Sequence, residues 1–210
     1  MDGICARCKT EVKGRVFRTA ISLMRHGRTL MNEKHLIIGS IDDPLSDVGR
    51  GQALQTAGGL KHSKTPNLIV TGPMARQKET GSIIGKSLDI SIQIDPRLRE
   101  RCVGEFEGKP EFEGMLKKFL TEEVPAPGAE PLSEFTHRVL TSLKTASSLM
   151  GRGLLITSAL PLVVMVCEVR GWKLTDAAEF PVPGNCEPIH FKVMEPCWKC
   201  GSIYYEDDLP

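Results

Sequence analysis

The sequence contains no long apolar run. Its longest apolar stretch, residues 160–167, is far shorter than the roughly 18 residues that a membrane-spanning helix needs. The N-terminal stretch MDGICARCKTEVKGR also lacks the apolar core and small-residue cleavage site of a secretory signal. We therefore expect a cytoplasmic protein that does not contact a membrane.

The sequence also lacks a strong excess of one charge, internal repeats and low-complexity tracts. It has 27 Lys+Arg against 26 Asp+Glu, a formal net charge of +1. This balance disfavours a surface that binds nucleic acid through gross charge. The 210 residues, 40% hydrophobic and 25% charged, are typical of a globular protein with a sizeable core.

Apolar runs of strand length alternate with longer segments of helical period. The expected strands are residues 17–24, 68–72, 90–94, 153–158 and 189–194. The expected helices are residues 46–60, 75–88, 112–120 and 134–150, the last capped by Ser133, and one that has Pro161 in its first turn. Residues 101–131 are expected to form an insertion that can act as a lid. The alternation favours an α/β fold with a mostly parallel central sheet.

Basic side chains follow two of the expected strands. The first strand ends in Arg25 and His26, and Arg76 lies in the first turn of the helix after the second strand. Parallel strands bind ligands at their carboxyl ends, and free N–H groups at a helix start favour anions. Two guanidinium groups can donate paired hydrogen bonds to a tetrahedral phosphate. The alternative is that these short sequences form ordinary surface turns with solvated arginine and histidine side chains.

Six sequence segments occur together in the order and at the spacing of a known family. They are LMRHGRTLMN, GSIDDPLS, Gly49 with Gln52-Ala53, GPMAR before Thr80, LRER followed by Gly104 and Glu107-Gly108, and PGAEPLSEFTHR. Over residues 20–194 the chain resembles the histidine phosphatases, which include the cofactor-dependent phosphoglycerate mutases and the fructose-2,6-bisphosphatase domain. The resemblance implies a three-layer phosphoglycerate mutase-like fold.

The resemblance also implies a mechanism. His26 would attack phosphorus and form a phosphohistidine that water then hydrolyses. Arg25, Arg76 and Asn32 would bind the phosphate, and Glu100 would protonate the leaving oxygen. A small phosphorylated molecule would be the substrate, and catalysis would need no metal or other cofactor.

The proposed acid lies between two arginines. Arg99 and Arg101 would lower the pKa of Glu100 and so oppose its protonated form, unless burial raises this pKa more. Glu105 and Glu107 are the alternative acids, although both also suit a solvated face of the insertion.

One family residue is missing. The family's second histidine follows the strand that matches residues 153–158, whereas this sequence has Ala159 there. An alanine cannot donate a hydrogen bond, and removing such a donor costs about 3 kcal/mol in the transition state. The alanine can be an engineered change, natural divergence toward a pseudo-enzyme, or a loss rescued by another residue such as His190. We expect His35, His62 and His137 to lie at the surface.

Two C-x-x-C pairs stand near the ends of the chain. The pairs are Cys5–Cys8 and Cys197–Cys200, a spacing that aims two thiolates at one metal ion. We expect them to form one structural zinc site with four cysteine ligands, the alternatives being a redox dithiol or unpaired thiols. Residues 1–16 and 195–210 would then form the two halves of a zinc-ribbon-like appendage on a main domain of residues 17–194.

Three functions of different classes follow from these patterns. The first is a phosphatase with activity weakened by Ala159. The second is a catalytically inactive sensor or scaffold that retains the arginines and binds a phosphorylated ligand. The third is an interaction module in which the zinc appendage binds a protein or RNA partner.

Overall fold

The computed structural model describes residues 3–4, 11–12, 17–62, 64–121, 126–148, 151–179, 182–194 and 203–207. The helices are α1 (Leu30–Glu33), α2 (Asp47–His62), α3 (Ala75–Leu88), α4 (Met115–Thr121), α5 (Leu132–Ser147) and α6 (Ala159–Arg170). The strands are β1 (Gly3–Ile4), β2 (Glu11–Val12), β3 (Phe17–Arg25), β4 (Leu68–Thr71), β5 (Ile92–Ile94), β6 (Gly151–Thr157), β7 (Ile189–Met194) and β8 (Tyr204–Asp207). Short 3-10 turns, including Pro96–Leu98, join them.

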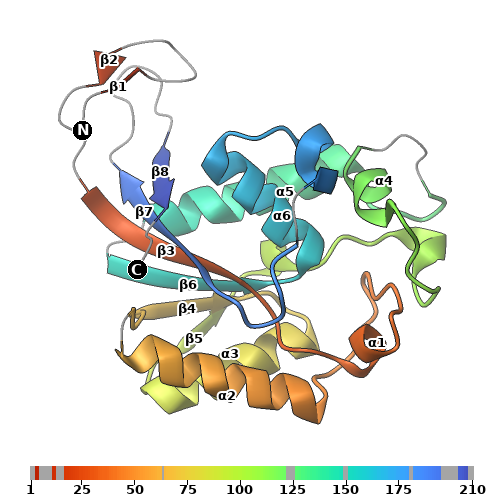
Figure 1. Cartoon of the computed structure of the whole chain (residues 1–210), viewed down its shortest axis with the longest axis horizontal. Coiled ribbons are helices and arrows are strands. Elements are labelled where there is room, and N and C mark those ends of the chain that lie inside the picture. The colour runs from red at the N-terminus through yellow and green to blue at the C-terminus, as the bar shows by residue number, and fades with distance from the viewer. Residues whose placement is uncertain are drawn as a thin grey trace.

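A six-stranded mixed sheet forms the middle layer, in the order β5-β4-β6-β3-β7-β8. The first four strands are parallel, whereas β7 pairs antiparallel with β3 and β8 pairs antiparallel with β7. Helices α2 and α3 cover one face of the sheet, and α5 and α6 cover the other (Figure 1). The expected α/β three-layer architecture is confirmed.

Alternation along the central strands explains the two layers of helices. On β6, Leu155 packs into one hydrophobic cluster, whereas Leu154 and Ile156 pack into the other. On β3, Leu23 and Met24 divide in the same way. Because successive strand side chains point to opposite faces, both faces of these strands are apolar and need a covering layer.

The start of helix α5 differs from the sequence prediction, whereas that of α6 agrees with it. Helix α5 begins at Leu132 with Pro131 at its N-cap position, so Ser133 does not cap it. Proline suits a helix start because its ring fixes φ and the first N–H groups have no helical partner. Helix α6 begins at Ala159, two residues before Pro161, which therefore still lies in the first turn as expected.

Strand β8 extends the main sheet beyond the expected domain boundary at residue 194. Ile203 and Tyr205 pack against the core, and the Tyr205 hydroxyl lies 2.9 Å from Ser147 Oγ on α5. Burial raises the pKa of this hydroxyl to about 12, so it stays protonated. Residues 203–207 therefore belong to the main domain, whereas Cys5, Cys8, Cys197 and Cys200 lie outside the described residues.

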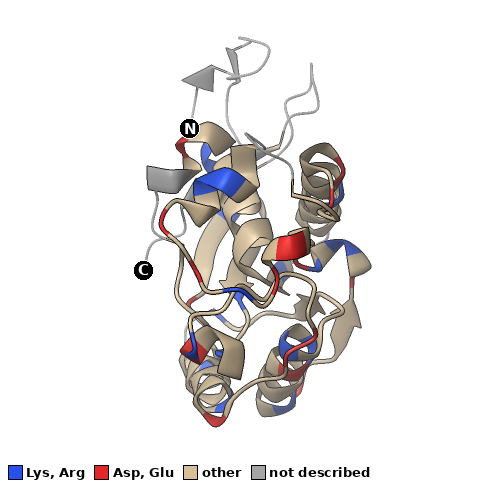
Figure 2. Ribbon diagram, turned by 90° about the vertical axis from the view of Figure 1, so that its right-hand side faces the viewer, with Lys and Arg blue, Asp and Glu red and all other residues tan. Residues whose placement is uncertain are grey.

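The surface of the described chain carries mixed charge. Figure 2 shows Lys and Arg positions interspersed with Asp and Glu over the helices and loops on one side of the molecule. In the part of the chain that is described, no helix combines the length and apolar character needed to cross a membrane.

Candidate active site

The carboxyl ends of β3, β4 and β6 open into one cavity of about 270 Å³. The predicted site residues that line it are Arg25, His26, Asn32, Arg76, Glu100 and Ala159. They come from five separate stretches of sequence, which the parallel sheet brings to one edge.

His26 is almost fully buried, and its ring is oriented from both sides. Its Nδ1 lies 2.7 Å from the carbonyl oxygen of Gly27, and Arg76 Nε donates to its Nε2 across 3.1 Å. Because Nε2 accepts this bond, Nδ1 carries the proton. Burial, helped by the Arg76 and Arg25 charges, holds the pKa of His26 well below its usual value. The ring is therefore neutral at physiological pH, with its Nε2 lone pair toward the guanidinium.

Gly27 allows close packing of the turn that carries His26 against helix α2. A Cβ added at Gly27 would lie 2.5 Å from the carbonyl oxygen of Gly49, at the start of α2. The Gly27 N–H also donates to Thr80 Oγ1 across 3.0 Å. The turn that carries His26 is thus clamped between α2 and α3.

The guanidinium of Arg76 is buried and held by backbone. Its Nη1 donates to the carbonyl oxygen of Ile41 (2.8 Å) and its Nη2 to that of Gly39 (3.0 Å). Each of these nitrogens retains a second hydrogen. The group is thus oriented beside the imidazole before any ligand arrives.

Arg25 has an unsatisfied donor. Its Nε is buried and has no hydrogen-bond partner among the described residues. A buried polar group without a partner is costly, so an anion in the adjoining cavity would stabilise this side chain. Asn32 adds a further donor, because Thr29 occupies its Oδ1 and leaves the Nδ2 group for a ligand.

Glu100 is buried at the cavity wall. Its Oε1 accepts from the Arg101 N–H (2.8 Å) and its Oε2 from the Leu160 N–H (3.4 Å). Burial raises the pKa of Glu100, and this effect exceeds the opposite effects of the two N–H groups, Arg76 and Arg25. The carboxyl group is therefore biased toward the protonated form that a general acid requires.

Comparison with known proteins identifies the family. The model of the histidine phosphatase superfamily (branch 1) matches residues 21–204. The chain belongs to this superfamily.

Among curated members of the superfamily, the chain is 30% identical to the probable phosphoglycerate mutase GpmB of Salmonella choleraesuis (strain SC-B67). That match spans 161 residues, 72% of this chain and 74% of the relative. The chain is 37% identical to the fructose-2,6-bisphosphatase TIGAR of Bos taurus over 130 residues, 58% of this chain and 48% of that relative.

Solved structures support the same fold. A mycobacterial glucosyl-3-phosphoglycerate phosphatase complexed with VO3 aligns with a TM-score of 0.76 at 21% identity, covering 91% of this chain and 98% of that one. A phosphoserine phosphatase mutant from Entamoeba histolytica aligns with a TM-score of 0.69 at 20% identity, covering 90% and 95%. At this identity the likeness shows the histidine phosphatase fold alone.

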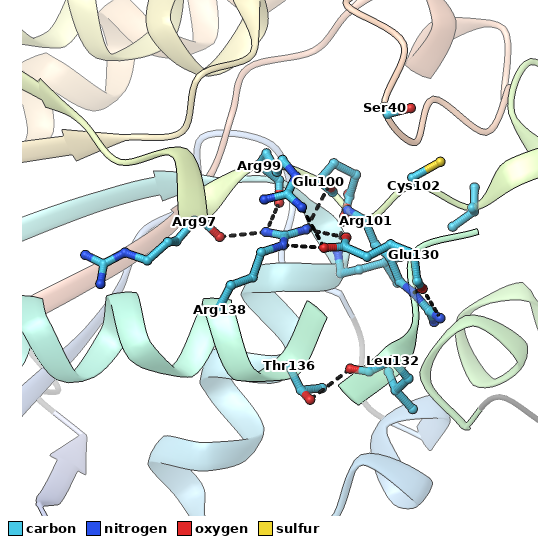
Figure 3. A network of polar contacts seen from close by, with 12 residues as sticks. Ser40, Arg97, Arg99, Glu100, Arg101, Cys102, Glu130, Leu132, Thr136 and Arg138 are labelled. Atoms are coloured by element: carbon cyan, nitrogen blue, oxygen red, sulfur yellow. Dashed lines mark hydrogen bonds and ion pairs between the residues drawn. The ribbon is translucent and has the colours of Figure 1, made fainter. Parts of the chain in front are cut away.

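A buried ion pair fixes the turn that carries Glu100 (Figure 3). Arg138 on α5 donates to the carbonyl oxygens of Arg97 (2.6 Å), Arg99 (2.8 Å) and Glu100 (3.1 Å). The same guanidinium forms two hydrogen bonds of 2.7 Å to the Glu130 carboxylate. Arg138 therefore holds the backbone of the turn, while its charge is balanced by Glu130.

The flanking arginines do not point at the Glu100 carboxylate. Arg99 Nη2 donates to Glu130 Oε1 (2.7 Å), and Arg101 donates to the carbonyl oxygens of Glu130 and Phe119. Because these two guanidinium groups bind elsewhere, burial raises the pKa of Glu100 more than Arg99 and Arg101 lower it. The sequence alone had left this balance open.

The alternative acids do not line the cavity. Glu107 Oε1 accepts from the N–H groups of Ser40 (2.8 Å) and Val103 (3.0 Å), so its carboxylate ties two loops together. Glu105 is exposed, 3.9 Å from Lys109 Nζ. Glu105 therefore lies on a solvated face as the sequence allowed, whereas the carboxylate of Glu107 stabilises the contact between two loops.

None of the other four histidines is among the described residues that line the cavity. His35, His62 and His137 are exposed, as expected. His190 on β7 is half-buried, and its Nδ1 lies 2.7 Å from Ser22 Oγ on β3. His190 therefore lies outside the set of described cavity residues, and Ala159 contributes only a methyl group there.

Much of the cavity lining was not predicted from the sequence. One side is an apolar wall formed by Leu36, Ile37 and Ile38 and, on α4, by Met115, Leu116 and Phe119. Glu111 also lines the cavity, and its carboxylate lies 3.4 Å from His35 Nδ1. The apolar run LII at residues 36–38 was a visible signal, but nothing in the sequence showed that it faces the predicted insertion.

Proposed function

We propose that this protein is a phosphomonoesterase that acts through a phosphohistidine at His26. The observation that carries the proposal is the 3.1 Å hydrogen bond from Arg76 Nε to His26 Nε2. It supports a neutral imidazole whose nucleophilic nitrogen lies beside a phosphate-binding guanidinium. Curated relatives are named as a mutase and a bisphosphatase, which supports phosphorylated substrates.

The reaction proceeds in two displacements. When a phosphoryl group binds, Arg76 Nε donates to a phosphoryl oxygen in place of His26 Nε2, which frees the lone pair. The Nε2 lone pair attacks phosphorus, the bond to the leaving oxygen breaks, and Glu100 gives its proton to that oxygen. The Glu100 carboxylate then takes a proton from water, whose oxygen attacks phosphorus, and the bond between phosphorus and Nε2 breaks to release inorganic phosphate. Arg25, Arg76 and the Asn32 amide stabilise charge on the transferred group throughout.

A phosphate-release assay with a His26→Ala control tests the proposal. The wild type should release phosphate from a panel of phosphomonoesters, and His26→Ala should not. Rapid quench into alkaline denaturant, in which the acid-labile phosphohistidine survives, followed by intact mass measurement should show an added phosphoryl group of about 80 Da on the wild type alone. Release that is equal in the two proteins would refute the mechanism.

We expect the activity to be weak. Ala159 lines the cavity at the start of α6, where the family places a second histidine, and its methyl group cannot donate to the phosphoryl group. The same observation favours the alternative of a catalytically inactive sensor or scaffold. A sensor would bind phosphate or vanadate in calorimetry without His26-dependent turnover, whereas an enzyme would show both.

A structural zinc site is a second, independent part of the proposal. Cys5 and Cys8 lie in the sequence between the paired strands β1 and β2, and Cys197 and Cys200 lie between the paired strands β7 and β8. The C-x-x-C spacing of both pairs is typical of structural zinc sites. In the part of the chain that is described, no cluster of three or more His, Cys, Asp or Glu side chains could hold a metal.

Metal analysis of purified protein tests the zinc proposal. One zinc per chain should be measured in the wild type and lost in a Cys5→Ser, Cys197→Ser double variant. Cys102→Ser is the matched control, because Cys102 lies in the described part of the chain and is not one of the four cysteines. Zinc that stays bound to the double variant would contradict the proposal, as would its absence from the wild type. If a partner binds through this appendage, removal of the zinc ion by a chelator should abolish that binding.

A further inference from the structure

We propose that the substrate carries a single phosphoryl group on an apolar alcohol, with an alkyl or aryl body rather than a second anionic group. This inference rests on the proposed function, and it concerns the end of the cavity that holds the leaving group. It follows from the charge, the chemistry and the size of the cavity lining.

The two cationic side chains of the described lining, Arg25 and Arg76, would both bind the same phosphoryl group. Arg25 and Arg76 are the only lysine or arginine side chains among the described cavity residues. Arg76 lies against the nucleophile, and Arg25 contributes a buried donor without a partner in the described chain. The sequence of the two undescribed stretches nearest in the chain, residues 122–125 and 180–181, adds no lysine or arginine.

The other charged groups of the lining are acidic. Glu100 is the proposed proton donor, and Glu111 lines the cavity with its carboxylate near the exposed His35. A second phosphate or a carboxylate on the substrate would lie near the carboxyl groups of Glu100 and Glu111, and no further lysine or arginine of the described lining could pair with it. Burying an unpaired charge is costly, so the cavity selects against such substrates.

The apolar wall provides the complementary surface. Ile37, Ile38 and Phe119 are each less than 10% exposed, and Leu36, Met115 and Leu116 are half-buried beside them. These side chains offer carbon surface and no hydrogen-bonding groups, so sugar hydroxyls would lose hydration there without replacement. An alkyl or aryl group would instead bury apolar area against the wall.

The size of the cavity limits the apolar body. About 270 Å³ lies just below the range of roughly 300–1,000 Å³ that is usual for sites of drug-sized ligands. A phosphoryl group together with one aromatic ring, or an alkyl group of similar size, is the scale that this cavity suits.

Two matched pairs of probes test the inference. In turnover assays, kcat/KM for benzyl phosphate should exceed that for 3-phosphoglycerate by at least about tenfold, and fructose 2,6-bisphosphate should be poorer still. In calorimetry, the non-hydrolysable benzylphosphonate should bind more tightly than phosphonoacetate, whose carboxylate replaces the ring. The binding experiment reads the preference even where turnover is slow.

A variant of the wall provides a second test. Leu116→Arg should weaken benzylphosphonate and strengthen phosphonoacetate binding, because it adds a cation for the carboxylate. Leu54→Arg is the control, since Leu54 is exposed on α2 and does not line the cavity. The control should leave both affinities unchanged.

The outcomes separate this inference from the proposed function. His26-dependent turnover that favours 3-phosphoglycerate or the bisphosphate would overturn the inference and leave the function standing. Absence of His26-dependent turnover with tight benzylphosphonate binding would overturn the function and support the apolar ligand. Equal or tighter binding of phosphonoacetate, or no binding of either phosphonate, would overturn the inference.

Discussion

Arg138 Nη2 donates a 3.1 Å hydrogen bond to the carbonyl oxygen of Glu100, the residue whose carboxyl group faces the cavity. The guanidinium holds the backbone of the acid while its charge pairs with Glu130. Both partners of this ion pair are close to 10% exposed. Arg138 is therefore a positioning residue that acts through Glu100.

Replacing Arg138 should affect catalysis and stability together. Arg138→Met leaves the Glu130 carboxylate without its main partner, and breaking a buried pair costs about 3–5 kcal/mol. In the variant that remains folded, kcat should fall by about tenfold or more with little change in KM, because the acid is misplaced while the phosphate site is intact. Kinetics and thermal melts of the same preparations measure both effects.

The readout that separates positioning from general destabilisation is the pH profile. The pH at which activity is lost on the alkaline side should move in Arg138→Met, because the surroundings of Glu100 change. Arg97→Met is the control, since its guanidinium binds Asp95 and does not contact Glu100. A variant with normal kcat and an unshifted profile would show that Arg138 is structural only.

The role of Glu100 as acid predicts a dependence on the leaving group. Glu100→Gln should lower kcat/KM for benzyl phosphate by about 10²–10⁴. The loss of kcat/KM, which reports the first displacement and not the later hydrolysis, should be much smaller for p-nitrophenyl phosphate, whose leaving oxygen needs no proton. Glu105→Gln is the matched control and should change neither rate. Equal losses on the two substrates would remove Glu100 from the acid role.

Glu100 should also make stability depend on pH in a defined direction. Its folded-state pKa is raised by burial, so above its unfolded value of about 4.3 the native state binds more protons than the unfolded state. Stability is thus lost as pH rises toward the folded-state pKa. Glu100→Gln should therefore melt at a higher temperature than the wild type at pH 8, and this difference should shrink near pH 4.

His26 should act in the opposite direction. Its folded-state pKa lies well below its unfolded value of about 6.5, so in that window the unfolded state binds more protons. Stability falls as pH drops below about 6.5. His26→Ala should remove this part of the acid sensitivity, which melting curves between pH 4 and 8 can follow. Parallel curves for the two proteins would contradict the buried neutral imidazole.

Restoring a donor at position 159 should raise the activity. Ala159→His should increase kcat by up to about 10²–10³, the usual effect of one transition-state hydrogen-bond donor. Ala159→Leu is the control, because it adds bulk without a donor and should not help. If Ala159→His leaves the phosphate-release rate unchanged, the cavity stabilises the transferred phosphoryl group in another way.

The sequence was most informative where the local chemistry was strong. Helix α3 begins at Ala75 and ends at Leu88 as expected, since strand β4 and Gly72-Pro73 precede it and Asp89 ends it in a left-handed conformation. Arg25, His26 and Arg76 could be found because the carboxyl ends of parallel strands meet at one edge, whereas Asn32, Glu100 and Ala159 were indicated by the family resemblance. Their separation in sequence was no obstacle, because the motifs mark each strand end.

The features that escaped prediction depend on tertiary partners. The role of Gly27 depends on Gly49, and that of Glu107 depends on two N–H groups from distant loops. Strand β8 is four residues long, and its place in the sheet is set by pairing with β7. Short segments carry too little periodicity to indicate such contacts.

The loop that follows residues 36–38 links two tasks that are chemically separate. Its carbonyl groups at Gly39 and Ile41 fix Arg76, while the side chains just before them shape the far end of the cavity. Substitutions in this loop that adapt the cavity to a new alcohol would also disturb the position of Arg76 and so weaken phosphoryl binding. Helix α4 contributes side chains to the same cavity from outside that loop, so new specificities can arise there with less loss of catalytic function.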